Sequence, residues 1–124
     1  MDSILTSVKK MLGIQEDYEH FDPEIIMHIN SAFMILNQLG VGPEEPFVVE
    51  NKMDSWDDVV PEGQIELVKT YVYMRVRLMF DPPTSSFLLD SLNKQIQEYE
   101  WRMNVQAEKD KLYPVDMGGI FVGE

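Results

Sequence analysis

Proline and glycine positions divide this chain into four helical stretches, and this division constrains the fold more than any other feature. Asp22-Pro23 places a capping side chain before a proline at the first helical position. Gly40 then allows that helix to end. Pro61 marks a later start. Asp81-Pro82-Pro83 ends the helix that follows, because proline lacks an amide proton and disfavours helix in the preceding residue.

Apolar residues recur at helical spacing within each of these stretches. The pattern predicts helices from Asp2 or Ser3 to Gly13, over 22–39, over 61–80 and over 87–108. The 61–80 stretch is apolar over more than half of its circumference, which is typical of the central helix of a bundle. We therefore predict an all-α fold, a small bundle of about four helices.

The remaining segments are predicted to be a long 41–60 loop and a C-terminal tail. Residues 1–108 are expected to form the helical domain, and residues 109–124 an extended or flexible tail broken by proline and glycine. Within the loop, we expect a short extended segment at 47–49, with Met53 and Trp56 covering the core. The last helix is expected to turn an inner stripe toward the core: Leu88, Leu89, Leu92, Ile96, Tyr99 and Met103.

Charge argues against direct binding of nucleic acid. The formal net charge is -12, whereas affinity for phosphates comes mainly from lysine and arginine. Twelve acids and one base, Lys52, lie between Glu16 and Glu62, while the signs mix from Leu67 onward. The molecule should have one acidic region and one nearly balanced region. The acidity also fits simple solubility.

The sequence gives no sign of catalysis, and we expect no catalytic, cofactor or metal site. Cysteine is absent, and His20 and His28 lack the spacing of a zinc-binding helix. The acidic cluster at 54–58 lacks the glycine and the terminal glutamate of a calcium loop. No glycine-rich phosphate loop precedes a helix. We expect neither a signal peptide nor a membrane span, and the lack of cysteine suits a reducing compartment.

Several surfaces instead look suited to contacts with other proteins. After Glu24, the 22–39 helix carries no formal charge, which is unusual for a solvated face. An ordinary exposed face remains the alternative. The candidate contact residues on this face are Met27, Asn30, Met34 and Asn37.

Three further features could contact a neighbouring chain. Arg75 falls inside the apolar arc of the 61–80 helix, so it needs an acidic partner, either within its own subunit or on a neighbour. Phe87, Trp101 and Val105 form a second apolar stripe on the last helix, which the loop or the tail could instead cover. The tail carries the apolar residues Tyr113, Ile120 and Phe121, which could pack on their own domain or extend onto a partner.

Two stretches, together spanning roughly Val8 to Glu108, resemble a known family. One runs from Phe21-Asp22-Pro23-Glu24 to Leu39-Gly40-Val41-Gly42-Pro43. The other is more distinctive and contains Arg75-Val76-Arg77-Leu78-Met79-Phe80-Asp81-Pro82-Pro83 before Glu100-Trp101-Arg102. This pattern is similar to that of the small head–tail connector, or head-completion, proteins of long-tailed bacteriophages and related prophages.

The resemblance implies a structural subunit of the virion, made in the bacterial cytoplasm. Such subunits form a ring, expected to be twelvefold, beneath the portal protein, and the free subunit could remain monomeric. The ring would extend the DNA channel and receive the next head-completion or tail protein. DNA would pass through without specific binding, and acidic walls would repel its phosphates.

A small acidic inhibitor or DNA mimic is the alternative. Such a protein would bind a basic partner as a monomer or dimer and would display its acids in rows at phosphate-like spacing. Here the acids of 16–62 fall mostly in predicted loops, which disfavours this hypothesis.

Overall fold

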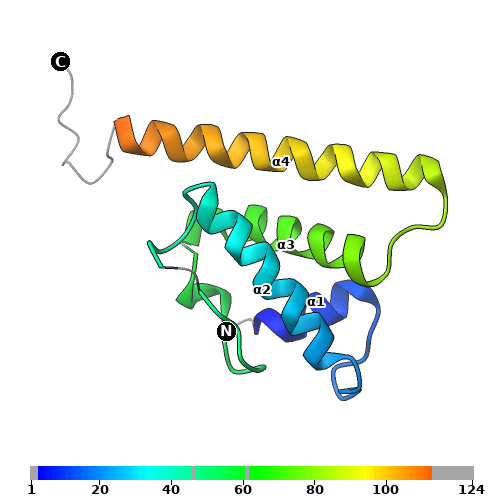
Figure 1. Cartoon of the computed structure of the whole chain (residues 1–124). Helices are drawn as coiled ribbons and strands as arrows, with labels where there is room; N and C mark the ends of the chain where they lie inside the picture. Colours follow the sequence, from blue (N-terminus) through cyan, green and yellow to red (C-terminus); the bar gives the residue numbers. More distant parts are fainter. Residues whose placement is uncertain (1–2, 46, 61, 113–124) are drawn as a thin grey trace.

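The computed structural model describes residues 3–45, 47–60 and 62–112. They form four α-helices and two short 3-10 helices: α1 (Ile4–Leu12), α2 (Asp22–Gln38), η1 (Trp56–Asp58), η2 (Glu62–Gln64), α3 (Ile65–Phe80) and α4 (Ser86–Leu112) (Figure 1). No β-strand occurs within the described ranges, where pairing is limited to one antiparallel bridge between Ser3 and Ser55. The prediction of an all-α bundle is confirmed.

The first helix begins and ends where its capping residues predict. The Ser3 side chain accepts a hydrogen bond from the Thr6 amide at 3.2 Å, which satisfies one of the free amides of the first turn. Gly13 ends α1 in the left-handed conformation, with φ of 84°. A residue with a side chain would be strained there. Local sequence therefore sets both ends of α1.

Helix α3 is the centre of the bundle and packs against α1, α2 and α4. Its buried residues are Val68, Tyr71, Val72, Met74 and Val76. Met79 lies on the same side of the helix as Val72, seven residues earlier, but is exposed. Periodicity gives the direction in which a side chain points, whereas its burial depends on how far the neighbouring helices extend.

The 41–60 loop folds along the body, and Trp56 supplies its main core contact. The indole is 1% exposed, lies beside Phe33, and donates a hydrogen bond from Nε1 to Ser7 Oγ at 3.2 Å. Met53, in contrast, is 80% exposed, so its predicted role in covering the core is wrong. Val49 is buried, but 47–49 forms no strand.

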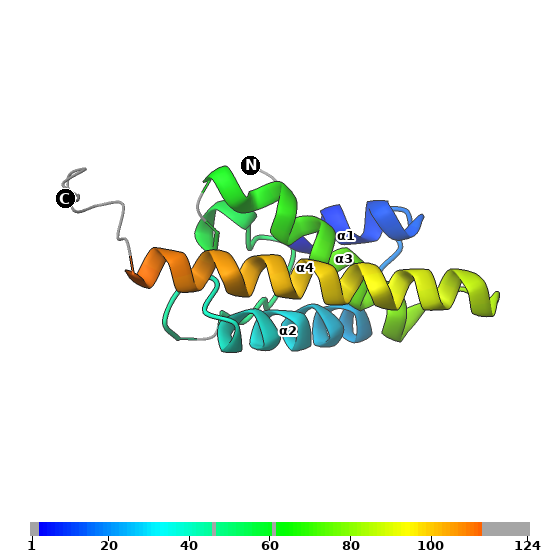
Figure 2. The ribbon, with the colours of Figure 1, turned by 90° about the horizontal axis from the view of Figure 1, so that it is seen from above.

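Helix α4 lies across the bundle and covers α3 (Figures 1 and 2). It begins at Ser86 after a cap from Ser85, whose Oγ accepts from the Leu88 amide at 3.4 Å. It continues to Leu112, beyond the predicted end at Glu108. Ile96 and Met103 are buried, but Leu88 is 55% exposed. Leu88 lies about 80° around the helix from Ile96, at the edge of the stripe rather than within it.

Candidate functional site

The outer side of α4 displays two large aromatic side chains. Phe87 is 78% exposed and Trp101 is 67% exposed. They are 14 residues apart, so they lie about 21 Å apart along the helix and on similar sides of it. Val105 continues the stripe but is half-buried. Large aromatic side chains are enriched among the residues that carry binding energy in protein interfaces, so these two are candidate contact residues.

The neutral side of α2 divides into two parts with different roles. Asn30 Oδ1 accepts from the Val49 amide at 2.7 Å, and Asn30 Nδ2 donates to the Val49 carbonyl at 3.1 Å. Asn37 Nδ2 donates to the carbonyls of Pro43 and Glu44 at 3.2 and 2.9 Å. Both asparagines therefore hold the 41–60 loop against α2.

The other part of this side consists of Met27 and Met34, and both methionines are exposed. They are seven residues apart, which places them on one side of the helix, two turns from each other. Methionine adapts its shape to a partner more readily than branched side chains do. Of the four α2 candidates, the two methionines are the ones that remain free to meet another molecule.

Arg75 finds its acidic partner within its own subunit. Its Nη1 atom lies 3.7 Å from Glu100 Oε2, and the same carboxylate oxygen accepts from Tyr71 Oη at 2.6 Å. Burial, followed by this hydrogen bond to Glu100, holds the pKa of Tyr71 above its ordinary value. Of the two alternatives raised for Arg75, the structure places its charge in an intramolecular contact that joins α3 to α4.

Arg77, two residues further along α3, was not singled out by sequence. Its Nη1 donates to Tyr73 Oη at 3.1 Å, which raises the pKa of the guanidinium. Its Nε atom is buried without a hydrogen-bond partner, and Arg77 makes no ion pair within the described part of the chain. The charge of Asp81 also raises the pKa of Arg77, but it is the smallest of the causes.

Arg77 lies in a groove of about 280 Å³ between the end of α3 and the start of α4. Its lining mixes apolar and polar side chains: Tyr73, Met74, Arg77, Pro83, Leu88, Ser91, Leu92 and Gln95. The exposed Leu88 belongs to this groove and not to the core. A cation with an unused donor beside apolar walls is suited to bind a carboxylate next to an apolar group.

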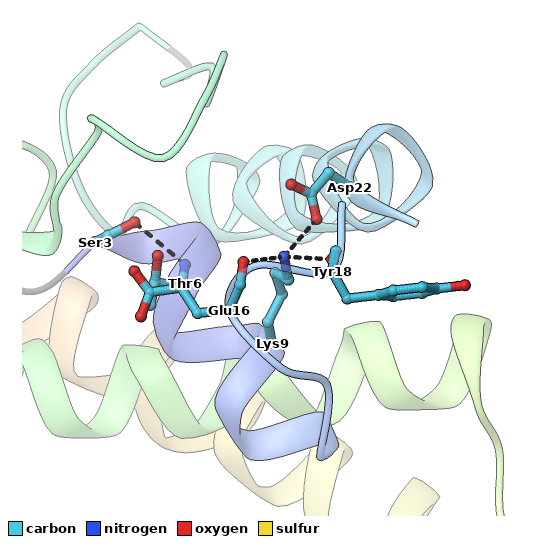
Figure 3. A network of polar contacts seen from close by, with 6 residues as sticks. All are labelled: Ser3, Thr6, Lys9, Glu16, Tyr18 and Asp22. Atoms are coloured by element: carbon cyan, nitrogen blue, oxygen red, sulfur yellow. Dashed lines mark hydrogen bonds and ion pairs between the residues drawn. The ribbon is translucent and has the colours of Figure 1, made fainter. Parts of the chain in front are cut away.

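A second polar centre, around Lys9, is structural (Figure 3). The Lys9 side chain is 2% exposed. Its Nζ donates to the carbonyls of Glu16 and Tyr18 at 2.9 and 2.7 Å, and lies 2.8 Å from Asp22 Oδ1. The two carbonyls accept two protons of the ammonium group, and the Asp22 carboxylate balances its charge. Sequence reasoning missed this role, because a lysine that follows an apolar run is usually expected to be exposed to solvent.

The cleft beside the later part of α4 offers no catalytic arrangement. It has a volume of about 530 Å³ and lies where the loop after α2 and η1 meet the later part of α4, at Met103, Gln106 and Ala107. Its ionisable side chains are the exposed Asp57 and Asp58. Among the described residues, no three histidine, aspartate or glutamate side chains gather closely enough to hold a metal ion.

The tail candidates Tyr113, Ile120 and Phe121 lie outside the described residues. Within the described part of the chain, no helix combines the length and the apolar character that crossing a membrane requires.

Comparison with known proteins gives one match. A family model described as "Phage connector protein" matches residues 4–110, which include all four α-helices up to the last turn of α4. No curated protein and no solved structure matches the chain.

Proposed function

Because the chain belongs to the phage connector protein family, we propose that it is a ring-forming subunit of the head–tail junction. Family membership itself makes it a structural protein of a bacteriophage that contacts other head or tail proteins. The proposal adds that the subunits form a ring, expected to be twelvefold, beneath the portal protein. The ring extends the DNA channel and receives the next head-completion or tail protein.

The observation that carries the proposal is the presence of unlike exposed patches on different helices. Phe87 and Trp101 project from α4, whereas Met27 and Met34 project from α2. A closed ring uses heterologous contacts, in which one patch of a subunit meets a different patch of its neighbour. A symmetric dimer would need only one self-complementary patch, so two unlike patches favour a ring.

The distribution of charge supports a channel that lets DNA pass. The segment from Glu16 to Glu62 carries twelve acids and one base, and most of these acids are exposed. A negative wall repels phosphates, so DNA moves through the lumen without being held. A basic lumen would instead retain the DNA.

Within this proposal, the interface residues have different roles. Phe87, Trp101 and Val105 contact a neighbouring protein, as do Met27 and Met34. Asn30 and Asn37 act through the loop that they hold. Residues 1–108 act as the connector domain, and α4 continues beyond them to Leu112. The tail from 109 onward contacts a partner through Tyr113, Ile120 and Phe121.

Assembly with the portal protein of the same phage tests the proposal. We expect the purified chain to be monomeric when dilute and to form rings when concentrated or mixed with portal, as seen by native mass spectrometry and negative-stain microscopy. The double change Phe87→Ser and Trp101→Ala should weaken assembly about tenfold or more, because interface aromatics carry much of the binding energy. Gln15→Ala, at an exposed residue outside α2 and α4, is the control and should assemble normally.

Two results would overturn the proposal. One is a chain that never associates with itself or with portal at any concentration. The other is tight binding to a nuclease or repressor by a monomer or dimer, which would support the acidic-inhibitor alternative.

A further inference from the structure

One end of the subunit carries the acidic 41–60 loop, and the other end carries the groove that contains Arg77. The 41–60 loop lies near the later part of α4, because Gly42, Asp57 and Ala107 line the same cleft. The Arg77 groove lies near the start of α4, against Leu88. Leu88 and Ala107 are 19 residues apart, which places the two sites about 28 Å apart along the helix. Both views show the loop toward one end of the body and the α3–α4 turn at the other (Figures 1 and 2).

The loop is acidic, and most of its acids are unused within the subunit. It contains six acids and one base, Lys52. Glu44, Glu45, Glu50 and Asp57 are exposed, and none of their side chains has an ion pair or hydrogen bond within the described residues. Asp54 and Asp58 instead accept hydrogen bonds from backbone amides of the loop itself. The loop therefore presents free carboxylates.

The groove at the other end contains an arginine without an acidic partner among the described residues. Arg77 has a buried Nε without a partner and no ion pair in the described part of the chain. The other arginines of α3 and α4 are already paired: Arg75 with Glu100, and Arg102 with Glu98. Because Nε is buried, a carboxylate from outside the subunit would approach the Nη atoms and pair with the guanidinium through charge-assisted hydrogen bonds.

We propose that the Arg77 groove of one subunit binds Glu44 or Glu45 from the 41–60 loop of a second copy of this chain. This inference rests on the proposed ring. The donor and the acceptor lie at opposite ends of the same molecule, so each contact leaves a free groove and a free loop for the next subunit. Repetition of this head-to-tail contact generates a ring when the rotation closes.

The loop is held in position for this role by α2. Asn37 donates to the carbonyls of Pro43 and Glu44, which fixes the backbone at the acidic pair. Asn37 thus acts as a positioning residue for the contact and does not touch the neighbouring subunit. Leu88, an exposed apolar residue that lines the groove, excludes water around the ion pair and strengthens it.

A charge exchange tests the contact. Arg77→Glu alone, and Glu44→Lys with Glu45→Lys, should each raise the concentration needed for ring assembly about tenfold or more, because each places like charges together. The chain that carries all three changes should assemble within about threefold of the unsubstituted protein. Assembly should also weaken as salt rises from low to physiological strength. The measurements are native mass spectrometry and sedimentation velocity.

The control is Lys10→Glu, which makes the same charge change at an exposed residue of α1 that does not line the groove and does not belong to the loop. It should leave assembly unchanged. Circular dichroism and thermal melting verify that each variant folds. If Arg77→Glu does not fold, the loop variant decides, since Glu44 and Glu45 are exposed and their replacement leaves the core intact.

Distinct outcomes separate this inference from the ring itself. If the unsubstituted chain forms rings and either charge reversal assembles equally well, the Arg77–loop contact is wrong while the ring stands. The contact is also wrong if the combined variant does not recover. If the unsubstituted chain forms no ring even with portal, the proposed ring fails, and this contact fails with it.

Discussion

The first three α-helices, which form the body of the molecule, bury their core-facing side chains more completely than the last helix does. In α1, α2 and α3, residues facing the core are almost fully buried, as Val8, Ile29 and Val72 illustrate with no exposed surface. Helix α4 is the longest helix, with 27 residues, yet in its described side chains only Ile96 and Met103 are buried. Its main packing partner is α3. The body supplies stability, and α4 supplies an exposed surface held on a stable support.

The largest effect is expected in the body, at Lys9. The change Lys9→Met keeps the volume but removes the ammonium that joins α1 to Asp22 and to the carbonyls of Glu16 and Tyr18. Breaking a buried ion pair leaves its partner unpaired, so we expect a loss of about 3 kcal/mol in the free energy of unfolding, measured by urea denaturation. Lys10→Met, at the exposed neighbour, is the control. Equal stability of the two variants would show that the Lys9 contacts are dispensable.

A smaller loss is expected where α4 meets α3. Ile96→Ala removes a buried side chain from an interface that can partly close around the gap, so we expect a loss of about 2 kcal/mol, at the low end for such changes. Urea denaturation of this variant beside Gln97→Ala gives the comparison. A loss of 4 kcal/mol or more would break the distinction between body and last helix, because α4 would then be as essential as α2.

The smallest effect is expected at Tyr71, and it depends on pH. Tyr71→Phe removes the hydrogen bond to Glu100, at a cost of about 1 kcal/mol near neutral pH. The folded pKa of Tyr71 is raised above its ordinary value of 10.0, so above that pH the unfolded chain releases a proton that the folded chain keeps. The contribution is complete below about pH 10 and is lost as pH rises further.

Stability curves of the Tyr71→Phe variant and the unsubstituted chain should therefore converge above about pH 10. The other tyrosines are common to both proteins and cancel in the difference. A constant difference across this range would show that the contact with Glu100 does not hold the Tyr71 proton.

Most of the helical architecture could be predicted from sequence, because its signals are local. Ser3, Gly13, Pro23 and the residues after Phe80 each act on their own turn of the chain. Burial at helix ends could not be predicted in this way. Met79 has the periodicity of a core residue and Leu88 lies at the edge of the inner stripe, yet both are exposed.

The candidate surfaces were predictable only in part. Exposure of Phe87 and Trp101 follows from their position opposite the inner stripe of α4. The partners of the two arginines do not follow from sequence, because they depend on where α4 crosses α3. Glu100 lies beside Arg75, whereas Arg77 in its groove forms no ion pair with a carboxylate of the described residues.

The asparagine contacts of α2 also have a consequence for how this protein can change over time. Asn30 and Asn37 hold the loop through its main-chain amide and carbonyl groups, which every residue except proline provides in full. At Glu44 and Glu45 the path of the loop is therefore largely independent of the side chains. Substitutions at Glu44, Glu45 or Val48 can alter which neighbour the loop recognises while its course stays the same. The loop can thus acquire new specificity one residue at a time without loss of the fold.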